Sequence, residues 1–195
     1  MSARKAVDEE LSQAKIIQVA RELFATTGYN AVSMRAIAKS LGYSPGSLYY
    51  HFKAKAELLS KIVVTDFKRL DEVLEETVAA PPSSTFSLLE RIFLAFIQFG
   101  MENRNAFEIM FLNQDSELNN YAQEAKMQSY DKFAEAVMTE ICYTDQTREF
   151  RFQTVFVLFL ALHGFVQYYI HSDQSYEDIA GLAKIHVKLL YKGLQ

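Results

Sequence analysis

The residues best suited to bind another molecule lie together in one segment, Ser44-Pro45-Gly46-Ser47-Leu48-Tyr49-Tyr50-His51-Phe52-Lys53. As a helix, this segment would bury only Leu48 and Phe52, which stand one turn apart. Small residues at its start would let the backbone approach a duplex, and the N–H groups there can bind a phosphate. Three outer side chains can donate to phosphates or reach base edges: Tyr49, Tyr50 and His51. The pattern predicts a helix that contacts DNA, the alternative being a tyrosine-rich helix packed on its neighbours.

Basic side chains accompany this segment. Lys53 and Lys55 flank it, and the fork of Arg35 matches the O6 and N7 acceptors of guanine, although a plain surface arginine would look the same. Residues 1–61 carry nine basic and five acidic side chains, whereas the remaining residues carry 11 and 19. The formal net charge of −4 therefore combines a basic N-terminal region with an acidic remainder. Unless this clustering is fortuitous, only the N-terminal region suits a polyanion.

Three predicted helices position these side chains. The first covers about residues 9–27 and stops at Gly28; the second runs from the cap Ser33 to Leu41. Gly42 gives the backbone freedom for a tight turn, and the third helix is capped by Ser44 and ends near Phe52. Two short helices joined by a glycine turn, with a supporting helix before them, form a helix-turn-helix DNA-binding unit. We therefore predict a DNA-binding domain over residues 1–54.

The segment from Gly28 to Leu59 resembles the DNA-binding signature of the TetR family of bacterial transcriptional regulators. The resemblance rests on a glycine-aromatic pair after the first helix, a serine cap, Ile-Ala within the second helix and a glycine in the turn. It continues with Gly-x-Leu-Tyr-x-His-Phe and Lys-x-x-Leu-Leu. One departure is Pro45, where many members have lysine or another polar residue, so the operator sequence does not follow from relatives.

The resemblance implies DNA contacts at named positions. From the second helix these are Ser33 and Arg35, and Lys55 matches the family's phosphate-contacting lysine. The third helix would contribute Ser44, Gly46, Ser47, Tyr49, Tyr50 and His51. The partners that the resemblance implies are double-stranded operator DNA, a small-molecule effector and a second copy of the chain.

The rest of the chain also shows helical periodicity, so we predict an all-α protein of about nine helices. The six further helices cover about residues 55–78, 87–103, 105–112, 117–141, 146–171 and 176–194. Pro81 and Pro82 end the first of these and form a candidate hinge. Ser87 with Glu90 has capping-box spacing, although Ser84 or Thr85 is an alternative cap. Residues 55–195 are expected to form the ligand-binding and dimerisation domain.

Aromatic and methionine side chains are concentrated in this second domain. It holds twelve of the fifteen phenylalanines from Phe86 onward. Methionine adapts to varied apolar shapes, so these side chains suit a ligand pocket; the alternative is an ordinary core. The candidate effector-binding residues are Phe93, Phe96, Phe107, Met110, Phe111, Met127, Tyr130, Phe156, Phe159 and His163. His163 lies in the most apolar segment, where it is either a polar handle for the ligand or makes a structural hydrogen bond or interface contact.

The last two predicted helices are apolar on more than one face. A helix that is apolar all round must be buried on both sides, which a second subunit would achieve. The candidate interface residues are Leu158, Leu162, Phe165, Val166, Tyr169, Ile179, Leu182, Ile185, His186 and Leu189. The resemblance implies a four-helix dimer interface, which would place two half-sites about 34–36 Å apart on one face of the duplex.

These features predict a repressor that an apolar or aromatic effector releases from its operator through movement of the fourth helix. We expect no enzyme, since no catalytic constellation or phosphate-binding glycine loop is visible. A non-specific architectural DNA-binding protein is the alternative. No metal site and no cofactor are expected, because Cys142 is the only cysteine and His163 and His171 lack carboxylates at ligand spacing. The polar N-terminus and the interrupted apolar stretch 155–170 favour a cytoplasmic protein without a membrane span.

Overall fold

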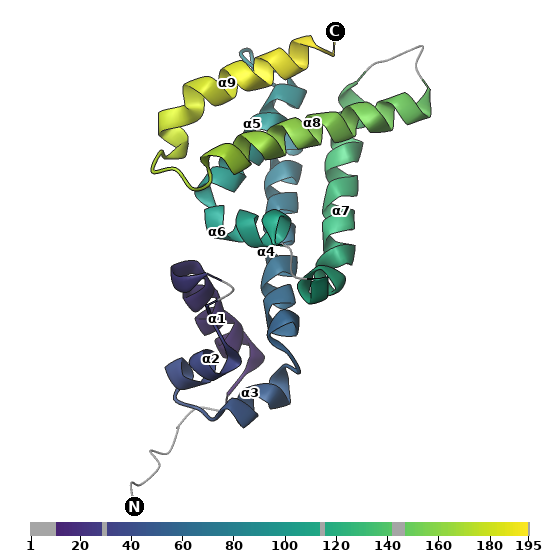
Figure 1. Cartoon of the computed structure of the whole chain (residues 1–195). Coiled ribbons are helices and arrows are strands. Elements are labelled where there is room, and N and C mark those ends of the chain that lie inside the picture. The colour runs from purple at the N-terminus through teal and green to yellow at the C-terminus, as the bar shows by residue number, and fades with distance from the viewer. Residues whose placement is uncertain (1–10, 29–30, 114–115, 142–146, 195) are drawn as a thin grey trace, which may run out of the picture. The chain divides into compact units, whose positions relative to one another are not determined.

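The computed structural model describes residues 11–28, 31–113, 116–141 and 147–194, and all regular elements within these ranges are helical. They comprise nine α-helices and one π-helical turn, which confirms the predicted all-α class (Figure 1). The helices divide between two compact units. The first comprises residues 1–65 and 113–123, and the second comprises residues 66–112 and 124–195. The fourth helix, α4 (Lys55–Ala79), contributes residues to both units.

The first unit contains the helix-turn-helix. It is built from α1 (Gln13–Thr27), α2 (Met34–Leu41), α3 (Pro45–His51) and the beginning of α4. The predicted caps are confirmed, because the Ser33 and Ser44 side chains each accept a hydrogen bond from the backbone N–H three residues on. Gly42 has a φ of 76°, the left-handed conformation that the turn requires. The core is made by apolar side chains from all four helices, among them Ile16, Phe24, Ile37, Leu48, Phe52 and Leu59.

The start of α1 differs from the prediction. Ser12 is its N-cap and accepts a hydrogen bond from the Lys15 N–H, so the helix begins at Gln13. Glu9, where the sequence pattern placed the start, lies outside the described residues. An extended N-cap with a side-chain oxygen satisfies a free backbone donor, and this local preference outweighed the apolar periodicity.

The second unit is formed by the remainder of α4 with five further α-helices. These are α5 (Leu88–Glu102), α6 (Arg104–Phe107), α7 (Ser116–Glu140), α8 (Arg148–Tyr169) and α9 (Tyr176–Lys192). The first residues of α7, up to residue 123, belong to the first unit. Reciprocal capping boxes begin α5 at Ser87 with Glu90 and α9 at Ser175 with Asp178. The cap of α5 is therefore Ser87, and the alternatives Ser84 and Thr85 are wrong. The helices α8 and α9 each end two residues before their predicted ends, and Gln146, where the former was expected to start, lies outside the described residues.

Two local features depart from a simple helical prediction. The helix expected over residues 105–112 is α-helical only to Phe107 and continues as a π-helical turn, η1 (Glu108–Leu112). Such turns often occur at functional sites.

The candidate hinge at Pro81 is held by Arg91, whose guanidinium donates to the carbonyls of Ala80 and Pro81.

The helix α5 packs against α8 and α9. At Gly100 the approach to α8 is so close that an added Cβ would lie 2.6 Å from Val166 Cγ1. This buried glycine therefore sets the distance between the two helices. By length and composition alone, α8 is the one helix in the described ranges that is long and apolar enough to cross a membrane.

Candidate DNA-binding surface and ligand cavity

The N-terminus of α3 is built to leave its backbone accessible. Ser44 Oγ accepts from the Ser47 N–H at 3.3 Å and is hydrogen-bonded to Ser47 Oγ at 2.9 Å. Pro45 occupies the first turn, where its missing N–H costs nothing. Gly46 is exposed, and a Cβ added there would meet nothing closer than Ser44 Oγ at 3.8 Å. The fold therefore does not require a glycine at this position.

Two tyrosines of α3 project into solvent. Tyr49 is 51% exposed and Tyr50 is 88% exposed, whereas Leu48 and Phe52 are buried as predicted. The alternative of a tyrosine-rich helix packed on its neighbours is therefore wrong for these two side chains. His51 is half-buried, and its ring stands edge-on to Tyr50 at 5.3 Å. The apolar ring of an exposed tyrosine is poorly hydrated, and its hydroxyl can donate a hydrogen bond. Such a side chain therefore suits contact with a polar surface such as DNA.

The basic candidates differ in their surroundings. Arg35 and the Lys53 side chain are exposed on the same unit, and Ser33 is exposed at the start of α2. Lys55 is half-buried, and its Nζ donates to the carbonyl of Val32 at 3.1 Å. This contact fixes the Lys55 side chain at the start of α4.

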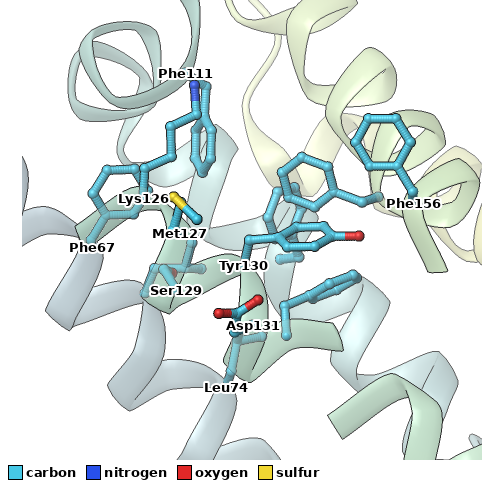
Figure 2. Close-up of a pocket in the computed structure, with 13 residues that line it drawn as sticks. Phe67, Leu74, Phe111, Lys126, Met127, Ser129, Tyr130, Asp131 and Phe156 are labelled. Atoms are coloured by element: carbon cyan, nitrogen blue, oxygen red, sulfur yellow. The ribbon is translucent and has the colours of Figure 1, made fainter. Parts of the chain in front are cut away.

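A cavity of about 400 Å³ lies within the second unit (Figure 2). Its walls come from α4, α5, η1, α7 and α8. The volume is typical of a small-molecule site. The lining residues are Phe67, Leu70, Leu74, Phe96, Phe111, Lys126, Met127, Ser129, Tyr130, Asp131, Phe133, Phe156 and Phe159.

Six of the ten predicted effector-binding residues line this cavity: Phe96, Phe111, Met127, Tyr130, Phe156 and Phe159. The other four do not. Phe93, Phe107 and Met110 are buried in the core beside it, because their helix positions turn them away from the opening. His163 is half-buried and lies behind the wall, with its ring centroid 5.3 Å from that of Phe111 and 5.9 Å from that of Phe159.

The wall of the cavity is a network of aromatic contacts centred on Phe96, which is 1% exposed. Its ring centroid lies 5.7 Å from that of Phe159, 5.9 Å from that of Phe133 and 6.2 Å from that of Phe111. Tyr130 stands edge-on to Phe159 at 5.3 Å, and burial raises the pKa of its hydroxyl. Rings at these separations support one another, so the wall persists without a ligand inside it.

A polar contact joins α4 to α7 beside the cavity. The buried carboxylate of Asp71 accepts from the Ser129 hydroxyl at 2.6 Å and pairs with Lys132 Nζ at 3.2 Å. Lys132 also reaches Glu75 at 2.9 Å, and these two contacts raise the pKa of its ammonium. We call these four residues the α4–α7 clasp. Ser129 also lines the cavity, so the clasp and the ligand space share a wall.

The sequence patterns missed the contribution of α4 to the cavity. Phe67, Leu70 and Leu74 follow one another at helical spacing on the buried face of α4, and this spacing was the available signal. The sequence does not distinguish them as lining residues, because a buried helical face has the same apolar spacing whether it meets a core or a cavity.

The predicted interface residues fall into two groups. Leu158, Leu162, Val166 and Ile179 are buried within the chain and are unavailable to a partner, because these positions of α8 and α9 face the core of the second unit. Leu182, Ile185 and Leu189 are 47%, 57% and 65% exposed. Phe165, Tyr169 and His186 are half-buried, with the Phe165 and His186 rings 4.9 Å apart.

Further exposed apolar residues lie on α8. Val157, Leu160 and Tyr168 are 62%, 50% and 79% exposed and share one face with Gly164. We call these residues, with Leu182, Ile185 and Leu189, the α8–α9 apolar face. Exposed apolar side chains gathered in this way mark an interaction surface.

Comparison with known proteins identifies the first unit. Residues 16–62 match the model of the bacterial regulatory proteins of the tetR family. These residues therefore form a DNA-binding domain of the tetR type. Over 58 residues it is 41% identical to the transcriptional regulator UidR of Escherichia coli K12, covering 30% of each protein. Over 49 residues it is 49% identical to QacR of Staphylococcus aureus Mu50, covering 25% of this chain and 26% of that one.

The chain thus spans about a third or less of the length of these curated TetR-family relatives. Solved structures extend the likeness of the fold to both units. FadR of Bacillus subtilis, whose structure is a complex with stearoyl-CoA, has a TM-score of 0.74 at 19% identity, covering 94% of this chain and 100% of that one. At this identity the likeness concerns the fold alone. The matched relatives are themselves transcriptional regulators.

Proposed function

We propose that the chain is a ligand-responsive repressor that binds a palindromic operator as a dimer and leaves it when an apolar or aromatic effector occupies the cavity. The observation that carries the proposal is the surface of α3, where Tyr49 and Tyr50 are exposed beside an accessible helix start. Folding alone gives no reason for these two side chains to be exposed. In a TetR-family unit they are placed to contact phosphates and base edges.

The α8–α9 apolar face supports the dimer. Gly164 and Gly181 lie on the exposed surfaces of α8 and α9, and a Cβ added at either would meet nothing within 4 Å. A second copy of the same two helices would cover this face in a two-fold arrangement. A chain whose exposed apolar helix is covered in this way needs no membrane, which fits a cytoplasmic protein.

Helix α4 supports coupling between operator and effector. It contributes residues to both units, three of its side chains line the cavity, and the α4–α7 clasp holds it beside that cavity. A ligand that prefers one position of α4 would change operator affinity, and DNA would change ligand affinity by the same factor, typically 5–150-fold.

Selection from a random duplex library tests the DNA-binding function. The purified chain is incubated with the library at physiological salt, and the retained DNA is sequenced. Enrichment of one inverted repeat is the expected result. Retention without a motif would contradict the proposal and favour the architectural DNA-binding protein, the second candidate that the basic N-terminal region allows.

The dimer is tested by Ile185→Glu, because this side chain is 57% exposed and the substitution leaves the core intact. The variant is expected to sediment as a monomer and to bind the selected repeat at least ~100-fold more weakly, since a buried unpaired carboxylate opposes association. Glu177→Gln, on an exposed position of the same helix, is the control. A wild-type chain that sediments as a monomer at micromolar concentration would contradict the dimer.

A further inference from the structure

The interior of the cavity offers almost no unused polar group. Nine of its lining side chains are phenylalanine, leucine or methionine. The Ser129 hydroxyl already donates to Asp71 at 2.6 Å. Apart from the hydroxyl of the half-buried Tyr130, these walls offer a ligand no polar partner, so most polar groups placed among them would lose their water without compensation. The buried part of a ligand must therefore be mostly apolar.

The charged lining residues belong to the exposed side of α7. Lys126 and Asp131 are both exposed, as are Met127 at 58% and Phe156 at 49%. Figure 2 shows the amine of Lys126 and the carboxylate of Asp131 on opposite sides of Tyr130. The two charges are thus separate, and the cavity has one cationic and one anionic margin.

The two margins differ in their other neighbours. Asp131 also lines a second hollow with Glu135, Arg148 and Arg151. On the cavity side, burial first and the Asp131 carboxylate second raise the pKa of Tyr130. Lys126 has no ion pair or hydrogen bond with any residue that the structure describes. Its charge reaches His163 behind the cavity wall, where burial first and the Lys126 ammonium second lower the pKa of the imidazole. Lys126 therefore offers an unpaired ammonium at the margin of the cavity.

We propose that the cavity takes an anionic amphiphile, with its apolar body among the aromatic rings and its carboxylate or similar group at Lys126. The inference rests on the proposed function only in taking this cavity as the effector site. A cationic or neutral ligand would leave Lys126 unpaired, whereas an anion gains a charge-assisted hydrogen bond at a margin that remains in contact with water.

The proposal is tested with three probes that share a ten-carbon chain: decanoate, decanol and decyltrimethylammonium. The chain contains no tryptophan, so Met127→Trp places a single fluorescent reporter at the exposed rim of the cavity. Each probe is titrated below its micelle concentration, and isothermal titration of the unmodified chain confirms the affinities. We expect decanoate to bind tightest, about threefold to tenfold better than decanol.

Variants locate the anion. Lys126→Gln is expected to remove the preference for decanoate over decanol, and Lys126→Arg to retain it. Lys68→Gln changes an exposed lysine of the same unit that does not line the cavity, and it is expected to leave all three affinities unchanged. Each methylene added from octanoate to decanoate should strengthen binding about fourfold while the walls still accept it.

The outcomes separate this inference from the repressor function. Equal affinity for decanol and decanoate, or tightest binding of decyltrimethylammonium, would overturn the anionic assignment. So would a failure of all three probes to bind a chain that still binds its selected operator, and the repressor function would then stand. The chain could instead bind decanoate with the expected dependence on Lys126 but select no operator motif. That result would support the ligand class and contradict the repressor function.

Discussion

The two units use aromatic side chains in opposite ways. In the first unit the tyrosines of α3 point into solvent, and Tyr50 is 88% exposed. In the second unit the rings around Phe96 are buried and enclose a cavity. Two adjacent tyrosines exposed on one short helix indicate a contact surface, whereas burial of a phenylalanine is the default and indicates nothing by itself. The candidate DNA-binding surface is therefore visible in side-chain types, whereas the cavity is visible only in packing.

The largest expected effect concerns the aromatic wall. Phe96→Ala removes the ring that contacts Phe107, Phe111, Phe133 and Phe159, and we expect it to lower the free energy of unfolding by about 3–5 kcal/mol. Phe156→Ala is the matched control, because this ring lines the same cavity but is 49% exposed. Urea unfolding followed by circular dichroism measures both. A loss below about 1 kcal/mol for Phe96→Ala would contradict the central position of this ring.

Two glycines, one in each unit, are expected to respond differently to substitution by alanine. Gly100→Ala would place a Cβ 2.6 Å from Val166 Cγ1, and we expect a loss of stability of about 1–3 kcal/mol from overpacking. Gly46→Ala meets nothing closer than 3.8 Å, so the better helix propensity of alanine should leave stability equal or higher by up to ~1 kcal/mol.

For DNA affinity the order of the two effects is expected to be the reverse of the order for stability. Gly46→Ala should weaken binding to the selected repeat, because the added methyl group separates the helix start from the duplex, and folded Gly100→Ala should retain it. Val166→Ala in the Gly100→Ala background relieves the clash and is expected to recover part of the lost stability. Thermal unfolding and fluorescence anisotropy with labelled duplex distinguish the two glycines. Equal affinity of Gly46→Ala and the unchanged chain would show that α3 does not approach DNA at this point.

Tyr50→Ala tests the exposed aromatic directly. We expect about a tenfold loss of operator affinity, equivalent to ~1–2 kcal/mol, with unchanged stability because the side chain is exposed. Tyr121→Ala, on an exposed tyrosine of the same unit outside α2 and α3, should change neither quantity. A loss of stability in Tyr50→Ala, or a similar loss of affinity in both variants, would place the function of Tyr50 in the fold rather than in DNA binding.

The smallest expected effect is on the pH dependence of stability. Burial lowers the pKa of His163 and of His186 in the folded chain, so the fold favours their neutral forms. Between the folded pKa and the unfolded value of about 6.5, the unfolded chain binds more protons. Stability should therefore fall as pH decreases through this window and level off below the folded pKa. Calorimetry from pH 7.5 to 5 measures the fall.

His163→Gln should make the fall shallower, since glutamine does not titrate. His171→Gln, at an exposed position, is the control and should reproduce the original profile. An increase of stability on acidification would show that these histidines have acidic partners in the fold and would reverse the assignment.

Local chemistry explains which parts of the fold were predictable. The caps Ser33, Ser44, Ser87 and Ser175 satisfy backbone donors within three residues, so a single sequence carries the signal for them. At α5 the same signal also allowed Ser84 and Thr85, and only the structure selects Ser87. The π-helical turn that carries Phe111 was not predictable, because its extra residue is accommodated by tertiary packing rather than by a local signal.

The same distinction holds for the sites. The exposure of Tyr50 follows from the apolar pattern of α3. Leu158 and Leu160 are equally apolar, and only the structure shows that the first is buried and the second exposed. Asp71 reads as part of an acidic run on α4, yet it is buried and bound to Ser129, which stands 58 residues away in the sequence. Contacts over such separations have no pattern in a single sequence, so the clasp and the α4 wall of the cavity required the fold.

Recognition of a specific DNA sequence by the first unit is best tested by a competition titration. The affinity of the chain for its selected inverted repeat is measured against a scrambled duplex of the same length, from 50 to 200 mM salt. We expect a ratio of the two affinities of at least ~10³ at physiological salt, with both affinities falling as salt rises. A ratio near one across the salt range would contradict it, because binding would then depend on phosphate charge alone.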